Sequence, residues 1–389
     1  MKLEDSWTVS GIHYGTGRPV QVKIQGTQIV NVSPDDSADH SDLPFIGPGL
    51  VDLQINGYGG RDFNTHPLSV DMVSSVTEQL WQTGVTAYCP TIITNGDQEI
   101  EDAARMIAKA CDQNTNVEHS VIGIHLEGPF ITPEDGPRGA HDRQYVKAPD
   151  WNLFQRWQEV AGGRISILTI SPEWESAPTF IERCVDNGVI VSIGHTSASP
   201  EQIQEAVKAG ARLSTHLGNG AHLMLPRHPN YIWEQLAEDS LYACIIADGF
   251  HLPDSFIKVA LRAKGDRLML VSDAVSLSGM PPGTYDMHIG GRVQLTEEGR
   301  LCVAEQPELL AGSAQMLTWG IGKLVSSGLT DLKNAWDMAS IRPARFVDSP
   351  HAGELAAGAA ADLVLFDMRG KELTVRQTIK GGQSVYTRA

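Results

Sequence analysis

The chain has 389 residues and a formal net charge of −17; 41% of its residues are hydrophobic and 20% are charged. This balance is typical of an ordinary folded protein and excludes a disordered or a membrane-embedded chain. The negative charge disfavours nucleic acid and anionic membranes as partners, because a phosphate backbone needs a basic face. An anionic substrate would therefore need a local cationic pocket.

Cysteine usage and the N-terminal segment indicate the compartment. The five cysteines are widely spaced and include no CxxC pair, so we expect reduced, mostly buried thiols. The opening segment MKLEDSWTVSG carries two acids and no apolar run of a signal peptide, and no later apolar run reaches membrane-spanning length. These features predict a cytoplasmic protein. At this length we expect one large domain with a smaller companion, or two comparable domains.

Both ends of the chain have strand-like sequences. Residues 1–48 contain strand-like pieces such as PVQVKIQGTQIVNVSP, and residues 353–389 contain ADLVLFDM and VRQTIKGGQSVYT, with no helical stretches in either segment. We predict that residues 1–48 and 353–389 pair into one small β-sandwich domain.

Between the two ends, one rhythm repeats: a short β-branched apolar run, a loop rich in Gly, Pro, His and Asp, and a helix-like stretch. Apolar runs without alternation are typical of strands buried on both faces. One helix-like stretch, SPEQIQEAVKAG, opens with Ser199 as N-cap and Pro200 as first helical residue. Eight such units predict a parallel (β/α)8 barrel of TIM type over residues 49–352. The eight runs are residues 49–57, 85–93, 121–130, 164–173, 188–198, 212–220, 242–252 and 267–275.

The segment after the eighth run departs from this rhythm. Residues from about 283 to 303 are expected to form a hairpin over the barrel, and residues 309–347 are expected to form two helices.

Acids and histidines fall at the carboxyl ends of the apolar runs, where a barrel of this type builds its active site. Taken singly, each could be a hydrogen-bonded structural residue or a turn cap. Together they favour function, because independent structural residues have no reason to occupy the same end of successive strands. The five residues are Glu127, His195, His216, His251 and Asp273.

Two imidazoles and one carboxylate from three strands form a His₂Glu set with an open position for water or substrate. We therefore expect Glu127, His195 and His216 to bind one divalent metal ion, with zinc as the first candidate. Asp273 beside the ion is suited to act as general base toward the attacking water. Amide hydrolysis is the reaction that this set of groups suits best.

The motifs of the chain resemble the N-acetylglucosamine-6-phosphate deacetylases of the amidohydrolase superfamily over essentially the full length. The motifs that carry the resemblance are PGLVDLQINGYGGRDFN, HLEGPF, RGAH, GHTSA, THLGN, IADGFHL, VSDA and LAGSA, in this order along the chain. The resemblance implies removal of the acetyl group from N-acetylglucosamine 6-phosphate, a homodimer, and an N-acetylated sugar phosphate as small-molecule partner.

The resemblance also implies roles for individual residues. Metal ligation falls to Glu127, His195 and His216, and catalysis to Asp273 and to His141, which would contact the acyl carbonyl. His251 and Arg227 would meet the sugar phosphate, with Arg227 reaching in from the partner subunit. The other expected substrate contacts are Ala140, Asn219, Gly220, Asp248, Leu310, Ala311, Gly312 and Ser313.

Two sequence features bear on these expectations. Many amidohydrolases carry HxH at the end of the first strand and bind a second metal there, whereas this chain has Gln54 and Asn56, so we predict a single ion. The segment after His216, NGAHLMLPRHPNYIW, differs from the usual pattern of the resembled family, and Arg227 stands in it without a second arginine or lysine cluster.

Two alternatives stay open. One arginine with nearby histidines is a modest cation set for a phosphate dianion, so the substrate could be a different, unphosphorylated N-acyl amino sugar or another N-acyl amino compound. The other alternative is a metal-free sugar-binding or scaffold protein on the same barrel. The presence of all three ligand candidates and the base disfavours it.

Overall fold

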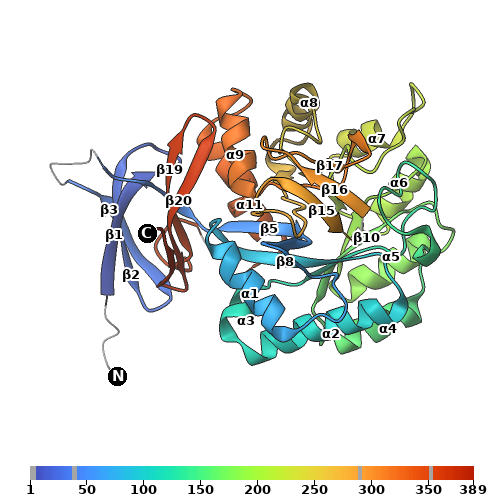
Figure 1. The fold of residues 1–389 in the computed structure, drawn as a ribbon, viewed down its shortest axis with the longest axis horizontal. Coiled ribbons are helices and arrows are strands. Elements are labelled where there is room, and N and C mark those ends of the chain that lie inside the picture. Colours follow the sequence, from blue (N-terminus) through green and yellow to red (C-terminus); the bar gives the residue numbers. More distant parts are fainter. Residues whose placement is uncertain (1–5, 37–41, 288–290, 350–353) are drawn as a thin grey trace.

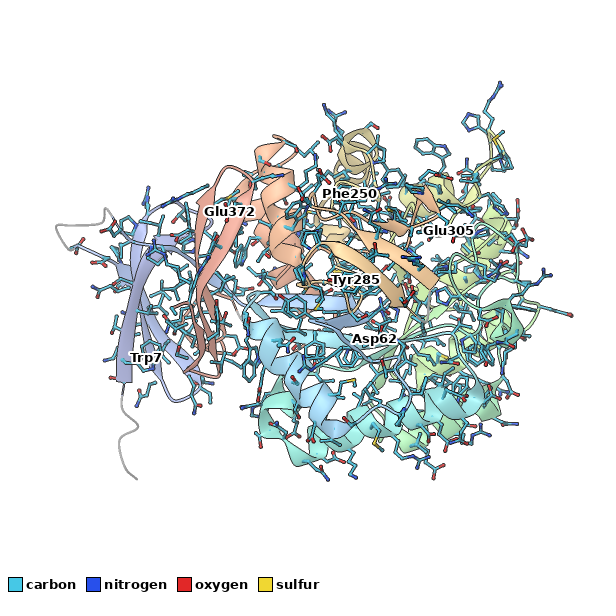
Figure 2. All side chains as sticks on the ribbon, in the orientation of Figure 1. Trp7, Asp62, Phe250, Tyr285, Glu305 and Glu372 are labelled. Atoms are coloured by element: carbon cyan, nitrogen blue, oxygen red, sulfur yellow. The ribbon has the colours of Figure 1, made fainter. Side chains whose placement is uncertain are left out.

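The computed structural model describes residues 6–36, 42–287, 291–349 and 354–389, which form a large helix-covered barrel and a smaller sheet domain (Figure 1). The smaller domain brings together the two ends of the chain. Figure 2 labels Trp7 in this terminal sheet, at one end of the molecule, and Glu305 of the inserted segment toward the other.

Eight parallel strands form the barrel in chain order. The ring closes where Ile55 forms a parallel bridge with Ala274. Each predicted run contains one of these strands, so the predicted (β/α)8 barrel is confirmed. The strands are β5 Leu50–Ile55, β8 Val85–Ile93, β9 Ile124–Glu127, β10 Ile165–Ile170, β11 Ile190–Ile193, β12 Leu213–Ser214, β13 Tyr242–Ile245 and β14 Leu268–Leu270.

Amphipathic helices cover the outside of the barrel and bury their apolar faces against it (Figure 1). The N-terminus of α6 matches its prediction: Ser199 Oγ accepts from Gln202 N at 3.3 Å, and Gln202 Oε1 accepts from Ser199 N at 2.8 Å. This reciprocal capping box satisfies two backbone donors. The helices are α1 Val70–Trp81, α2 Asp97–Gln113, α3 Thr115–Ser120, α4 Trp151–Val160, α5 Ala177–Asp186, α6 Pro200–Lys208, α7 Tyr231–Ala237 and α8 Asp254–Lys264. Shorter elements are β6 Gly57–Tyr58, β7 Arg61–Asp62 and the 3₁₀ turns Arg143–Tyr145 and Gly265–Arg267.

The segment after β14 is more elaborate than the predicted hairpin. It forms a four-stranded antiparallel sheet that packs Leu277, Val293 and Leu301 into a small core of its own. The fourth strand was missed because nearly all of its residues are exposed and it contains Pro307, which weakens a strand signal. Residues 288–290 of the predicted hairpin lie outside the described residues. The strands are β15 Gly283–Met287, β16 Gly291–Leu295, β17 Leu301–Val303 and β18 Gln306–Leu310.

Three helices follow this sheet where two were expected: α9 Leu317–Ser326, α10 Leu332–Met338 and α11 Ile341–Phe346. The last two are separated at Ser340, whose backbone leaves the helical region with φ −141 and ψ −86. Ser340 Oγ donates to Gly49 O at 2.6 Å. This contact with the start of the barrel fixes the break.

The terminal domain is one continuous seven-stranded sheet in the order β21–β20–β19–β4–β1–β2–β3. Strand β4 joins the two ends of the chain, since it pairs with β1 on one side and β19 on the other. The sheet bends so that β2 and β3 face β19 and β20 across a core that includes Val22, Ile24, Leu365 and Ile379. A β-domain from both termini is thus confirmed; its limits at residues 48 and 353 stay a prediction, and residue 353 lies outside the described residues. The strands are β1 Ser6–His13, β2 Pro19–Gln25, β3 Gln28–Pro34, β4 Phe45–Pro48, β19 Leu363–Arg369, β20 Glu372–Lys380 and β21 Gln383–Thr387.

A buried ion pair ties this domain together and gives a test of it. Lys380 Nζ donates to Asp362 Oδ2 at 2.6 Å, and the two side chains are only 5% and 2% exposed. Lys380→Ala leaves the Asp362 charge buried without its cation, so we expect the free energy of unfolding to fall by about 3–5 kcal/mol in chemical denaturation. Arg345→Ala is the matched control, because its pair with Glu354 is exposed and should contribute at most about 1 kcal/mol. Equal losses in the two variants would contradict the assignment.

Among the described helices, none is both long enough and apolar enough to span a bilayer. All five cysteines are buried and unpaired, as the sequence predicts.

Candidate metal centre and active site

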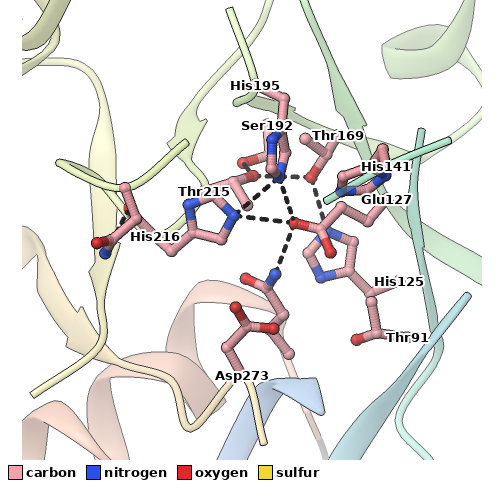
Figure 3. Close-up of polar contacts among 12 residues, drawn as sticks. Thr91, His125, Glu127, His141, Thr169, Ser192, His195, Thr215, His216 and Asp273 are labelled. Carbon is pink, nitrogen blue, oxygen red and sulfur yellow. Dashed lines mark hydrogen bonds and ion pairs between the residues drawn. The ribbon is translucent and has the colours of Figure 1, made fainter. Parts of the chain in front are cut away.

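The candidate site lies at the carboxyl ends of the barrel strands. Glu127 is the last residue of β9, His195 and His216 each follow two residues after β11 and β12, and Asp273 follows β14. The backbone is left-handed at His195, His216 and Asp273, with φ of 48°, 26° and 47°. Such a conformation is uncommon outside glycine and concentrates at functional sites. It turns the side chains inward, and Figure 3 shows them pointing toward one another.

Three ligand-type atoms meet in this cluster. Glu127 Oε1 lies 3.2 Å from His195 Nε2 and 3.0 Å from His216 Nε2, and the two Nε2 atoms lie 3.0 Å apart. Ligands of a tetrahedral zinc ion, bonded at about 2.0–2.2 Å, are separated from one another by roughly 3.3–3.5 Å. The three atoms therefore have a spacing close to that which one divalent ion requires.

The protonation pattern also suits a cation. His195 Nδ1 donates to Pro137 O at 2.8 Å, which leaves the Nε2 lone pair facing the cluster. Burial opposes ionisation of Glu127, but the rings of His195 and His216 against its carboxylate outweigh it and hold the pKa of Glu127 well below its usual range. The carboxylate is thus in the form that binds a cation. His216 Nδ1 is buried without a protein partner, so it can still donate to a bound molecule.

His141 lies beside this trio. Ligand-type atoms of Glu127, His141 and His195 lie within 4.8 Å of one another, which makes a second possible set. His216 fits the ion better, because its Nε2 is only 3.0 Å from both other ligand atoms, whereas His141 Nδ1 is bonded to Thr94 Oγ1 at 2.8 Å. Burial, followed by the nearby His195, lowers the pKa of His141 to about 3, so His141 is neutral near pH 7.

Asp273 is held next to the cluster by the end of β5. Asn56 Nδ2 donates to Asp273 Oδ1 at 2.8 Å, and Gln54 Nε2 donates to Glu127 Oε1 at 2.7 Å. Burial and then the Glu127 charge raise the pKa of Asp273 to about 7, while His216 lowers it. A carboxyl group with a pKa in this range can both take up and release a proton near neutrality.

A buried chain of hydroxyl groups lies next to the cluster and was not expected from the sequence. Leu53 O accepts from His125 Nδ1 at 3.0 Å, so His125 Nε2 accepts from Thr169 Oγ1 at 2.7 Å. Thr169 in turn bonds Thr215 at 2.7 Å, and Ser192 bonds Thr215 at 2.6 Å. Thr215 precedes His216, so this chain supports a ligand candidate, and Figure 3 shows Thr169, Ser192 and Thr215 next to the cluster. The members of this hydroxyl chain come from neighbouring strands at no common spacing from the ligand candidates, so no pattern in the sequence marks them.

The expected substrate residues are distributed around this centre. Ala140 precedes His141 in an exposed turn, and Asn219 Nδ2 donates to His216 O at 3.3 Å. The four residues Leu310, Ala311, Gly312 and Ser313 lie beside Asp273, because Ser313 forms a parallel bridge with Ala274.

Three other residues expected to contact the substrate, Asp248, His251 and Arg227, lie outside the cluster of ligand candidates. Asp248 directs its carboxylate to its own turn, accepting from His251 Nδ1 at 2.7 Å and from Phe250 N at 2.8 Å, and is only 5% exposed. His251 is near enough to Asp273 to influence its ionisation. Arg227 is exposed on the loop between Gly220 and α7, outside the buried cluster. The substrate roles of all three residues stay predictions.

Gly220 offers a steric test of the centre. Its φ is +58°, and an added Cβ would lie 2.9 Å from His195 Nδ1. We expect Gly220→Ala to displace His195 and weaken metal binding by about 10–100-fold, as measured by calorimetric titration. Gly162→Ala is the matched control, with φ +60° and nothing within 4 Å of its added Cβ. If both variants bind metal like the parent, His195 does not hold the ion.

Comparison with known proteins identifies the class. A model described as "Amidohydrolase family" matches residues 45–385. The chain therefore belongs to the amidohydrolase family, a family of metal-dependent hydrolases, and the cluster lies where a barrel enzyme places its active site.

More particular relatives share most of the chain. It is 31% identical over 344 residues to the N-acetylglucosamine-6-phosphate deacetylase of Lysinibacillus sphaericus, across 87% of this chain and 85% of the relative. It is 33% identical over 331 residues to the N-acetylgalactosamine-6-phosphate deacetylase of Shewanella sp. (strain ANA-3), across 84% and 80%.

Two solved deacetylase structures have a similar fold over nearly the whole chain. The N-acetylglucosamine-6-phosphate deacetylase of Pasteurella multocida superposes with a TM-score of 0.86 at 25% identity, across 99% of this chain and 100% of the other. A mutant of the Mycobacterium smegmatis enzyme in complex with N-acetyl-D-glucosamine-6-phosphate gives a TM-score of 0.84 at 26% identity, across 98% and 99%.

Proposed function

We propose that this chain hydrolyses the N-acetyl group of N-acetylglucosamine 6-phosphate and releases glucosamine 6-phosphate and acetate. One observation carries the chemistry: ligand atoms of Glu127, His195 and His216 converge within 3.0–3.2 Å in the mouth of an amidohydrolase barrel. The substrate is supported by the relatives named for this activity, which align with most of the chain.

Glu127, His195 and His216 would hold one divalent ion per subunit, and the donor set favours zinc. The ion would lower the pKa of a water molecule and polarise the acyl carbonyl. Gln54 and Asn56 are poor zinc ligands, and their amide nitrogens donate to the carboxylates of Glu127 and Asp273. This supports a single ion in each site.

The chain's own residues would move the proton. Asp273 takes a proton from the attacking water as the new C–O bond forms, and returns it to the nitrogen as the C–N bond breaks. The second proton of the water passes from the new carboxyl group to the amine, so the products are acetate and the ammonium form of the amino sugar. His141, fixed by Thr94, would contact the acyl oxygen, and the backbone at Ala140, Asn219 and Gly220 would contact the sugar.

A homodimer would complete the phosphate site. His251, oriented by Asp248, would contact the phosphate from within the subunit, and Arg227 would reach it from the partner subunit. The loop that carries Arg227 also carries Leu223 and Met224, which are 95% and 87% exposed. Apolar side chains exposed to this extent favour contact with another protein surface. We place the enzyme in the cytoplasm, consistent with its unpaired cysteines.

One relative supports a second candidate substrate. The relative at 33% identity is named for N-acetylgalactosamine 6-phosphate, which differs from the first substrate only at C4 of the sugar. An unphosphorylated N-acyl sugar is the remaining alternative.

Steady-state deacetylation of the two phosphorylated epimers and of unphosphorylated N-acetylglucosamine separates these candidates. The highest kcat/KM should fall on N-acetylglucosamine 6-phosphate. Arg227→Ala should raise KM for the phosphorylated sugar at least about 10-fold, because a charged hydrogen bond is lost. Arg105→Ala, an exposed arginine of α2, is the control. Equal kcat/KM with and without the phosphate would contradict the phosphosugar, and an unchanged KM in Arg227→Ala would remove the assigned phosphate contact.

A further inference from the structure

Asn56 stands at the point where the barrel closes, and its side chain is joined to the base. Its Nδ2 lies 2.8 Å from Asp273 Oδ1, although the two residues are 217 positions apart. The backbones on both sides are interlocked: Asp273 N donates to Gln54 O at 2.9 Å, and Asn56 N donates to Ala274 O at 2.8 Å. The two side chains therefore face each other across a fixed seam.

The orientation of the Asn56 amide follows from donor and acceptor chemistry. An ionised carboxylate can only accept hydrogen bonds, so the amide nitrogen must face Asp273. This engages Oδ1 of Asp273 and leaves its Oδ2 as the oxygen available for proton transfer. The carboxylate needs such a support, because Asp273 has a left-handed backbone and burial disfavours its charge.

The other half of the same amide is unpaired. Asn56 is 8% exposed, and its Oδ1 is buried with no hydrogen-bond partner. An unpaired buried carbonyl is destabilising, so a purely structural amide would be expected to satisfy both of its halves. Asn64, eight residues later, does so: its Nδ2 donates to Thr91 O at 3.0 Å and its Oδ1 accepts from Ile93 N at 2.9 Å.

We propose that Asn56 is a positioning residue for the reaction, which holds one oxygen of Asp273 so that the other is aimed at the proton it must transfer. The inference rests on the proposed function, from which it takes both the substrate and the role of Asp273 as the base. Asn56, directly after β5, would then position the base and would not bind a metal ion. Because Asn56 acts through the base, it should affect turnover and leave both substrate affinity and metal content intact.

The test compares Asn56→Ala, Asn56→Asp and Asn64→Ala as zinc-loaded proteins. We expect Asn56→Ala to lower kcat about 10–100-fold, with KM within twofold and one ion still bound per chain. Asn56→Asp keeps the shape but replaces the donor by an acceptor, so its kcat should fall at least as far. Asn64→Ala should lower the melting temperature while the kcat of the loaded protein stays within threefold. A kcat within twofold of the parent in Asn56→Ala, or a loss that follows metal loss, would overturn the proposal.

A crystal structure of zinc-loaded Asn56→Ala gives an answer that does not depend on the substrate. We expect the Asp273 carboxylate to rotate or to occupy more than one orientation. An unchanged, single orientation would overturn the proposal. If the parent protein fails to deacetylate the acetylated sugars, the proposed function fails, while this crystallographic comparison still decides the role of Asn56.

Discussion

Replacing Asp273 with asparagine is expected to lower kcat/KM about 10²–10⁴-fold, the range that a positioned general base contributes. Asparagine has nearly the same shape but cannot take up a proton. The loss corresponds to about 3–5.5 kcal/mol of transition-state stabilisation. The three ligand candidates are untouched, since Glu127, His195 and His216 meet without Asp273. We therefore expect the variant to bind one ion with near-parental affinity, as measured by elemental analysis and calorimetry alongside steady-state rates.

The control for this variant is Asp254→Asn. Asp254 begins α8 and pairs with Lys323 in an exposed ion pair, so its change should leave kcat/KM within about twofold. If Asp273→Asn kept more than a tenth of the parental kcat/KM, another group would have to be the base. If it lost its metal, Asp273 would have to be counted among the ligands.

The barrel could be predicted because its strands are buried on both faces. Strand β5 is buried at all six positions, and such runs can be recognised without knowing what packs against them. The convergence of Glu127, His195 and His216 then follows from topology, since the carboxyl ends of parallel strands share one mouth of the barrel.

Contacts fixed by long-range register could not be predicted in this way. The pairing of Gln54 with Glu127 spans 73 positions, and that of Asn56 with Asp273 spans 217. The first depends on the register of β5, β8 and β9, and the second on where the ring closes, between Ile55 and Ala274; no local pattern encodes either. The break between α10 and α11 also depends on a long-range contact, because Ser340 is held by Gly49, 291 positions away.

Solvent exposure explains why strand β18 was missed. Strand β18 pairs with β17 but exposes most of its side chains, so its sequence lacks the alternation that identifies a half-buried strand. The role of Arg227 stays a prediction, because this exposed loop residue is expected to act in the partner subunit.

Replacing His195 with alanine is expected to lower the affinity for zinc more than 100-fold, and deacetylation should fall in proportion. Loss of an outer hydrogen-bond partner alone costs about 10–100-fold in metal affinity, and removal of a ligand should exceed this. The stabilisation of the folded protein by zinc should also distinguish the variant from the parent. A ligand present at about 1,000 times its Kd stabilises the folded state by about 4 kcal/mol, so zinc should raise the melting temperature of the parent protein clearly and that of His195→Ala far less.

His66→Ala is the matched control, because His66 is exposed and its ring bonds the side chain of Asn95, away from the cluster. Its zinc-dependent shift in melting temperature should equal that of the parent. Chelation completes the design: it should abolish deacetylation by the parent, and added zinc should restore it. The parent protein could instead deacetylate equally well after chelation and show no change in melting temperature on addition of zinc. This result would show that the cluster of Glu127, His195 and His216 does not act through a metal. That cluster would then have to be explained as a buried ion pair shared among one carboxylate and two imidazoles, in which His195→Ala destabilises the fold with no dependence on zinc.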